Sequence, residues 1–252
     1  KVKELGGVMG VYNGWERANW FAQPGDDTSE EGTHTWGRSG PWEQRIKEEC
    51  EAVRDGCGMI AIPGFSRLTV AGPGARAYVD SLTASKLPKP GRVSLAYFAD
   101  HRGRIVTEMS AIVHSDDEVG LITAATAQWH DAEVLWRGAP DGITVTDHTD
   151  AVEALLVTGP QAREILAPLV EGHDLSKGWL TASFDGKVAG QDAALLRVSF
   201  AGELGWEVHA APAAMPAIWD ALLAAGVKPF GMYALDSLRL EKGQLNVGPL
   251  RI

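Results

Sequence analysis

The chain has 252 residues, which is enough for one large domain or for two of about 100–150 residues. Its hydrophobic content of 45% and charged content of 22% are typical of a soluble globular protein. The net charge of −10 argues against nucleic acid or an anionic membrane as the main partner, because both are themselves negative. No run of about 18 apolar residues is present, so no membrane-spanning helix is predicted.

The two cysteines, Cys50 and Cys57, form neither a disulfide framework nor a metal-binding motif. The histidines are scattered, so no metal site is predicted. We expect reduced thiols and a cytoplasmic protein, or one of the mitochondrial matrix if the source is eukaryotic. The first residues show no signal-peptide pattern, and the chain does not begin with methionine, so it can belong to a longer protein.

Residues 1–40 show little periodicity and are rich in turn-forming residues, so we predict a loop-like connector there. Four tryptophans lie in the first 42 residues: Trp15, Trp20, Trp36 and Trp42. An aromatic-rich irregular segment needs another surface to cover it. Two interpretations are open, a strap that lies on its own globule and a connector that once joined an upstream domain.

The remaining chain alternates short strands with helices. In the first part we expect a helix at 41–55, strands at 59–62 and 65–70, a helix at 74–82, strands at 93–98, 104–113 and 118–123, a helix at 124–137 and a strand at 142–147. In the second part we expect strands at 151–157, 183–188, 193–200 and 206–210, and helices at 162–169, 212–226 and 232–241. Hairpins outnumber crossover helices, which favours an α+β fold of mostly antiparallel sheets.

A sequence pattern occurs twice, at residues 68–82 and 155–169. Each copy is an apolar strand, a Gly-Pro turn and an amphipathic helix. The repeat predicts two similar halves, 41–150 and 151–252, with a ligand cleft between them. The first turn is not a dinucleotide fingerprint, because it lacks the third glycine and Pro73 removes a backbone donor.

Three segments carry candidate chemistry. Glu108 lies in an otherwise apolar strand, where a partly buried carboxylate needs a partner or a ligand, although a glutamate on the solvent face is an equal alternative. Glu203 lies between two glycines and is flanked by aromatic residues that can stack a flat heterocycle, although an ordinary hairpin turn fits as well. Residues 231–243 begin a helix whose first amides could face an anion, or which could be purely structural.

These motifs, in this order, resemble the tetrahydrofolate-binding aminomethyltransferase family. Its members include the glycine-cleavage T-protein and the C-terminal halves of dimethylglycine and sarcosine dehydrogenases or oxidases. The resemblance rests on residues 200–207 and 234–243, on both Gly-Pro units and on residues 103–108, and it extends over almost the whole chain to Gly243. Residues 14–22 and 125–131 are similar to the methylamine-dehydrogenase branch, where the first of them would follow the flavin domain.

The resemblance implies two ferredoxin-like halves around a folate cleft. Glu108 matches the family carboxylate near folate N10, where the T-protein has Asp, and an acid–base role is expected for it. Glu203 matches the glutamate that holds the pterin ring. The aromatic neighbours of the ring match Phe65, Tyr97, Phe200 and Trp206, with Tyr233 nearby. Leu235 replaces a T-protein arginine, which favours the methylamine branch over the glycine-cleavage reaction.

The implied activity is tetrahydrofolate-dependent one-carbon transfer. A unit derived from an N-methylated amine such as dimethylglycine or sarcosine would be captured as 5,10-methylenetetrahydrofolate. FAD would be held only by a partner flavoprotein domain or subunit, and the C-terminal barrel of the family is expected to be absent. The alternatives are a non-catalytic folate-fold module that binds or regulates, and an O- or S-demethylase of the same fold.

Overall fold

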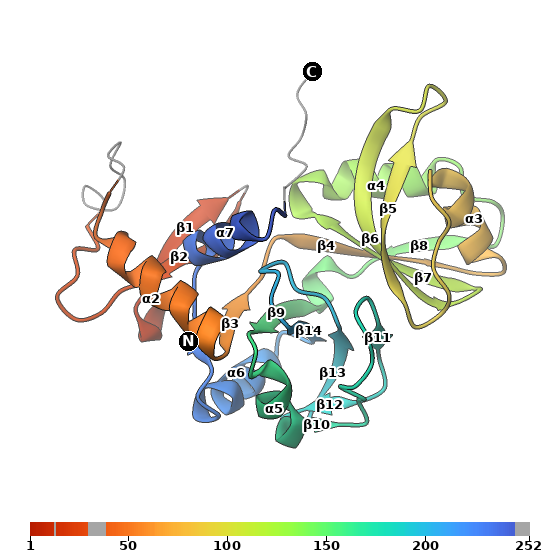
Figure 1. The fold of residues 1–252 in the computed structure, drawn as a ribbon. Coiled ribbons are helices and arrows are strands. Elements are labelled where there is room, and N and C mark those ends of the chain that lie inside the picture. Colours follow the sequence, from red (N-terminus) through yellow and green to blue (C-terminus); the bar gives the residue numbers. More distant parts are fainter. Residues whose placement is uncertain (13, 30–38, 245–252) are drawn as a thin grey trace.

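The computed structural model describes residues 1–12, 14–29 and 39–244. Two larger sheets and one hairpin form the framework, and helices lie against each of them (Figure 1). The predicted α+β architecture of mostly antiparallel sheets is therefore confirmed. Within the described residues, no helix is long and apolar enough to cross a membrane.

The first sheet has five antiparallel strands in the order β5-β6-β7-β4-β8. They span β4 (Phe65–Ala71), β5 (Val93–Ala99), β6 (Ile105–Ser115), β7 (Glu118–Ala124) and β8 (Thr144–Asp147). Apolar residues on one face of this sheet form a core with the helices α3 (Ala75–Leu82) and α4 (Gln128–Trp136), the latter preceded by the short turn η2 (Ala125–Ala127). We call the opposite face of this sheet the helix-free face, because α3 and α4 pack on the other side. Glu108 lies on the helix-free face.

The second sheet has eight strands and draws on both parts of the chain. Its members are β3 (Gly58–Ala61), β9 (Glu153–Thr158), β10 (Val170–Glu171), β11 (Ala182–Ser183), β12 (Lys187–Val188), β13 (Gln191–Leu196), β14 (Gly205–Ala210) and β15 (Lys228–Pro229). The helices α5 (Ala162–Leu166) and α6 (Met215–Ala224) pack on one face of it; the turns η3 (Thr149–Ala151) and η4 (Ala167–Leu169) lie nearby in the chain. Because β3 pairs with β9, the sheets do not divide at residue 150.

The two sheets meet through a small apolar cluster. It joins Val93 and Ile112 of the first sheet to Ala182 and Leu196 of the second. A backbone hydrogen bond from Val93 N to Leu180 O, 3.0 Å long, joins the same two regions. Part of the helix-free face of the first sheet is therefore covered by the second sheet, and the remainder stays open.

The prediction that residues 1–40 are loop-like is wrong for their described part. After the short turn η1 (Lys3–Leu5), β1 (Gly7–Tyr12) and β2 (Trp15–Phe21) form an antiparallel hairpin. The signal was obscured because β2 buries two consecutive residues, Trp20 and Phe21, instead of alternating. The hairpin lies beside α2 (Trp42–Asp55) and α7 (Met232–Glu241), as Figure 1 shows. Trp36 lies outside the described residues.

The repeated Gly-Pro unit is confirmed as strand, turn and helix in both copies. Gly72 and Gly159 adopt almost the same backbone angle, with φ of 131° and 135°. A Cβ atom would lie 2.1 Å from the Gly142 carbonyl oxygen at the first and 2.4 Å from the Gly56 carbonyl oxygen at the second. Both turns need glycine because the backbone of another segment passes directly over them.

Two strand predictions in the second part need correction. The predicted strand at 183–188 is two short strands, β11 and β12, separated by a turn. The predicted strand at 193–200 ends at Leu196, because the chain there leaves the ladder and pairs Arg197 with Thr181 instead. Phe200 consequently lies in the loop between β13 and β14, together with Glu203.

Candidate functional site

Three predicted site residues lie on the helix-free face of the first sheet. Met109 and Phe98 point into the helix-covered core, so their alternate neighbours Glu108 and Tyr97 point to the opposite face. Tyr97 and Glu108 are direct cross-strand partners, and Phe65 pairs with Ala124 on the next strand pair. The register of β6 and β7 brings Glu108 level with Ala124, so the three side chains form one row across the sheet.

Some side chains of this row and beside it are exposed to solvent. Neighbouring strands are about 4.8 Å apart, which places Phe65 about 10 Å from Glu108, two strands away. Phe65 is 39% exposed, and Leu95, on the same face as Tyr97, is 45% exposed. An accessible strip of aromatic and aliphatic side chains with one carboxylate at its middle fits a flat, partly apolar molecule that carries a hydrogen-bond donor.

Glu108 has an unsatisfied oxygen. Its Oε2 atom is buried and has no hydrogen-bond partner. Burial raises the pKa of the Glu108 carboxyl above its usual range, and hydrogen bonding from the Tyr97 hydroxyl opposes that rise. The alternative of an ordinary glutamate on the solvent face does not account for a buried oxygen without a partner, because such an oxygen loses its hydration without compensation.

The second set of predicted residues lies on the loop between β13 and β14 and on α7. Glu203 forms an ion pair with Lys242, which directly follows α7, and its Oε1 atom lies 2.8 Å from the Lys242 Nζ atom. Phe200 is 37% exposed, and the Arg239 guanidinium lies 5.7 Å from the centre of its ring. The C-terminal end of α7 therefore contacts both predicted ligand-binding residues of this loop, Glu203 and Phe200.

Trp206 and Tyr233 differ in their access to solvent. Trp206 is only 3% exposed and belongs to the core of the second sheet, where the guanidinium groups of Arg197 and Arg163 lie 4.6 Å and 5.8 Å from its ring centre. Direct contact between its ring and a ligand would require these arginines to move. Tyr233, at the start of α7, is 36% exposed and makes an edge contact with Trp42.

Leu235, the position at which the T-protein pattern has arginine, is buried in the core beside α2 and α7. A leucine there contributes apolar packing and no charge. Arg239 is therefore the one residue of α7 that carries a guanidinium group, and its Nε atom already donates a hydrogen bond of 2.7 Å to Asp236.

Arg67 is a residue that the sequence did not single out. It follows Phe65 by two positions on β4, so it lies on the same helix-free face. It is 9% exposed, and its buried Nε atom has no partner. The negative charges of Glu207 on β14 and Glu153 on β9 act on it, so this part of the first sheet faces the second sheet. The sequence could not have revealed Arg67, because a single buried arginine in a strand leaves no periodic pattern.

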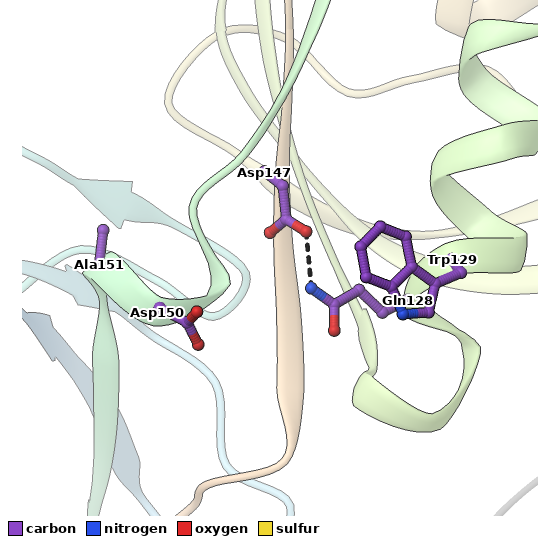
Figure 2. Close-up of a pocket in the computed structure, with 5 residues that line it drawn as sticks. All are labelled: Gln128, Trp129, Asp147, Asp150 and Ala151. Atoms are coloured by element: carbon purple, nitrogen blue, oxygen red, sulfur yellow. Dashed lines mark hydrogen bonds between the residues drawn. The ribbon is translucent and has the colours of Figure 1, made fainter.

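An open depression of about 510 Å³ lies at a different place, beside the start of α4 (Figure 2). It is lined by Gln128, Trp129, Asp147, Asp150 and Ala151. None of the predicted site residues lines it, and β8 is the strand of the first sheet farthest from Tyr97 and Glu108. Gln128 Nε2 donates a hydrogen bond of 2.6 Å to Asp147 Oδ2, and Figure 2 marks this bond.

The neighbouring pair His130 and Asp131 has a packing role. Asp131 is fully buried and accepts hydrogen bonds from Thr123 Oγ1 at 2.5 Å and from His130 Nδ1 at 2.9 Å. These bonds satisfy a buried carboxylate and tie α4 to β7. In the part of the chain that the structure describes, no three His, Cys, Asp or Glu side chains are grouped so that they could hold a metal ion.

The fold of the chain matches that of a solved structure. Over 97% of this chain and 61% of the other, it superposes on the glycine cleavage system aminomethyltransferase T from Bartonella henselae with a TM-score of 0.78 and 21% identity. The model of the GCVT N-terminal domain family matches residues 1–249. The chain therefore belongs to the GCVT N-terminal domain family.

Curated relatives carry two kinds of name. Mitochondrial dimethylglycine dehydrogenase from Rattus norvegicus is 31% identical over 96% of this chain and 29% of its own length. The formaldehyde-forming 4-methylaminobutanoate oxidase from Paenarthrobacter nicotinovorans is 32% identical over 98% of this chain and 31% of its own length. An aminomethyltransferase from Picosynechococcus is 34% identical over 79% of this chain and 55% of its own length. The chain thus spans about a third to a half of these relatives.

Proposed function

We propose that this chain binds tetrahydrofolate and captures the methyl-derived carbon of an N-methylated amine as 5,10-methylenetetrahydrofolate. The observation that carries the proposal is the row of Phe65, Glu108 and Tyr97, with a buried, unpartnered carboxylate oxygen at its centre. An N–H donor of a bound folate would satisfy that oxygen, and the exposed aromatic side chains would cover the ring system. The residues present therefore fit the cofactor.

The chemistry of the step assigns a role to Glu108. Bound tetrahydrofolate would supply two nitrogen atoms, N5 and N10, which together take up one carbon from formaldehyde with loss of one water molecule. Glu108 would accept a proton at Oε2 and return it to the departing oxygen. Burial raises the pKa of the Glu108 carboxyl, so this group holds a proton more readily than an exposed carboxyl does, which suits it to the exchange.

Glu203 would hold the pterin ring from the other side, with Phe200 and Tyr233 as exposed aromatic neighbours. Its carboxylate can accept two parallel N–H donors, and Lys242 lies beside its Oε1 atom. Because the ring of Trp206 is covered, this residue would act indirectly, by holding the guanidinium of Arg197 near the loop between β13 and β14.

The oxidative step that generates the carbon would take place on a separate flavin-containing domain or subunit. The names of the relatives, a dehydrogenase and an oxidase of methylated amines, support this assignment. They also favour an amine donor over an ether or a sulfonium compound. Assays with one methylated donor of each kind, in the presence of the partner flavoprotein, would distinguish the three.

Binding is tested with the purified chain. Addition of 5-formyltetrahydrofolate, a stable reduced folate, is expected to raise the melting temperature and to change tryptophan fluorescence with saturation. p-Aminobenzoylglutamate, which lacks the pterin, serves as the control and is expected to bind much more weakly. Equal responses to both compounds, or none to either, would contradict the proposal. Folate binding without any methylene transfer would instead select the non-catalytic module.

A further inference from the structure

A buried carboxylate outside the proposed site joins three segments of the chain. Glu49 on α2 is 6% exposed. Its Oε1 atom accepts the backbone N–H of Phe21 in β2 at 2.7 Å, and its Oε2 atom accepts the backbone N–H of Gly231 at 2.8 Å. Each oxygen thus bonds a different segment, so this side chain ties the N-terminal hairpin to the start of α7.

The joint between β2 and α7 has no spare room. A Cβ atom on Gly231 would lie 2.2 Å from the carbonyl oxygen of Asn19, so the two backbones are in direct contact. Gly231 itself has an extended backbone, with φ of −105°, so the need for glycine comes from this close approach and not from strain. A shift of the hairpin would therefore be transmitted to the first residue of the helix.

The far end of α7 reaches the loop that carries the predicted pterin-binding residues. Lys242, directly after the helix, contacts Glu203 at 2.8 Å, and Arg239 in its last turn lies over Phe200. Gly202 lies so close to Lys242 that a Cβ atom there would be 2.4 Å from its Cγ atom. One short helix thus contacts Glu49 at its beginning and the loop between β13 and β14 at its end.

We propose that Glu49 is a positioning residue that links the place of the N-terminal hairpin to the place of Glu203. Coupling of this kind needs a contiguous set of contacts and a rigid element between them, and α7 with its two ends supplies both. A displacement of the hairpin therefore reaches the loop between β13 and β14 through Glu49 and α7. Only the statement that this loop binds folate rests on the proposed function.

The coupling is tested first in the unmutated chain, by native-state hydrogen exchange at rising urea concentration. The amides of Phe21 and Gly231 are expected to open together with those of residues 198–205 and α7, on one shared isotherm. Separate isotherms for the hairpin and for the loop would overturn the proposal. This measurement requires neither a ligand nor a variant.

The variant Glu49→Gln tests the carboxylate itself. The amide keeps one acceptor oxygen and loses the other, so one of the two N–H groups is left without a partner. Exchange is expected to speed up at least tenfold both at the hairpin and at residues 198–205. A purely local role would change only Phe21 and Gly231. Glu48→Gln, at the exposed neighbouring position, is the matched control and is expected to leave the loop unchanged.

A folate-binding measurement distinguishes a failure of this proposal from a failure of the proposed function. The affinity for 5-formyltetrahydrofolate is expected to fall about three- to tenfold in Glu49→Gln and to be restored in part by Glu49→Asp, which keeps both oxygens. If the unmutated chain does not bind the folate, the proposed function fails, while the exchange experiment still decides the coupling. If folate binds equally well in Glu49→Gln and in the control, the positioning role is overturned.

Discussion

Glu108 and Glu203 come from the two parts of the chain and have opposite surroundings. Glu108 projects from the middle of a strand, and its buried Oε2 atom has no partner. Glu203 lies on a loop, and one of its oxygen atoms already contacts Lys242. A partly desolvated carboxylate with one unpartnered oxygen is suited to exchanging a proton, whereas one held in an ion pair is suited to holding a ligand in place.

We propose that these different surroundings give two residues of similar chemistry different tasks. A strand fixes the direction of its side chains by its pairing, so Glu108 stays on the helix-free face beside its cross-strand neighbour Tyr97. A loop allows Glu203 to be held by a residue far along the sequence. The difference therefore originates in the elements that carry the two carboxylates.

The largest expected effect is that of Glu108→Gln on transfer. The amide cannot take part in proton exchange, so formation of 5,10-methylenetetrahydrofolate is expected to fall by about 10²- to 10⁴-fold. The affinity for 5-formyltetrahydrofolate is expected to stay within about threefold, because the shape of the row is kept. The rate is measured in single-turnover experiments and the affinity by calorimetry. Unchanged turnover would remove Glu108 from the mechanism.

Glu203→Gln is expected to act on affinity. Loss of a charged acceptor costs about 1.5–3 kcal/mol, which corresponds to a loss of roughly 10- to 100-fold in folate affinity. The transfer rate of the bound complex is expected to change much less than in Glu108→Gln. Calorimetric titration of both variants checks this. If the two substitutions had the same effects on affinity and on rate, the division of roles would be wrong.

Much of this comparison could be predicted from the sequence. Apolar periodicity placed Glu108 in a strand, and the flanking glycines placed Glu203 in a turn. The ion pair of Glu203 with Lys242 could not be predicted, because it joins a loop to the end of a helix 39 residues away in the chain. Likewise, nothing local revealed that Trp206 is covered by two arginines or that β3 joins the second sheet, since pairing between distant segments leaves no periodic signal.

Lys242→Met sharpens the interpretation of Glu203. The pair is partly exposed, and such pairs contribute up to about 1 kcal/mol, so freeing the carboxylate is expected to change folate affinity by no more than about fivefold, towards tighter binding. Arg54→Met, which removes a different ion pair, with Glu241 of α7, is the matched control. Clearly weaker binding in Lys242→Met would show that the lysine itself contacts the ligand.

The pH dependence of stability offers the smallest effect. Burial raises the pKa of Glu108 in the folded chain, so the folded state holds this proton more firmly than the unfolded state does. Unmutated protein should therefore lose stability relative to Glu108→Gln as the pH rises from below the ordinary carboxyl range to neutral. Urea unfolding at several pH values measures the difference. Glu48→Gln is expected to show the opposite sign, because hydrogen bonds from Gln44 and Arg45 lower the pKa of Glu48.

The central claim is that the two carboxylates, one from each part of the chain, face the same bound folate. The most direct measurement is a nuclear magnetic resonance titration of protein with 13C-labelled glutamate side chains, assigned with Glu108→Gln and Glu203→Gln. Addition of 5-formyltetrahydrofolate is expected to shift the carboxyl signals of both residues with one shared saturation curve. If only one of the two signals shifts, or if neither shifts, the two carboxylates do not face the same bound folate.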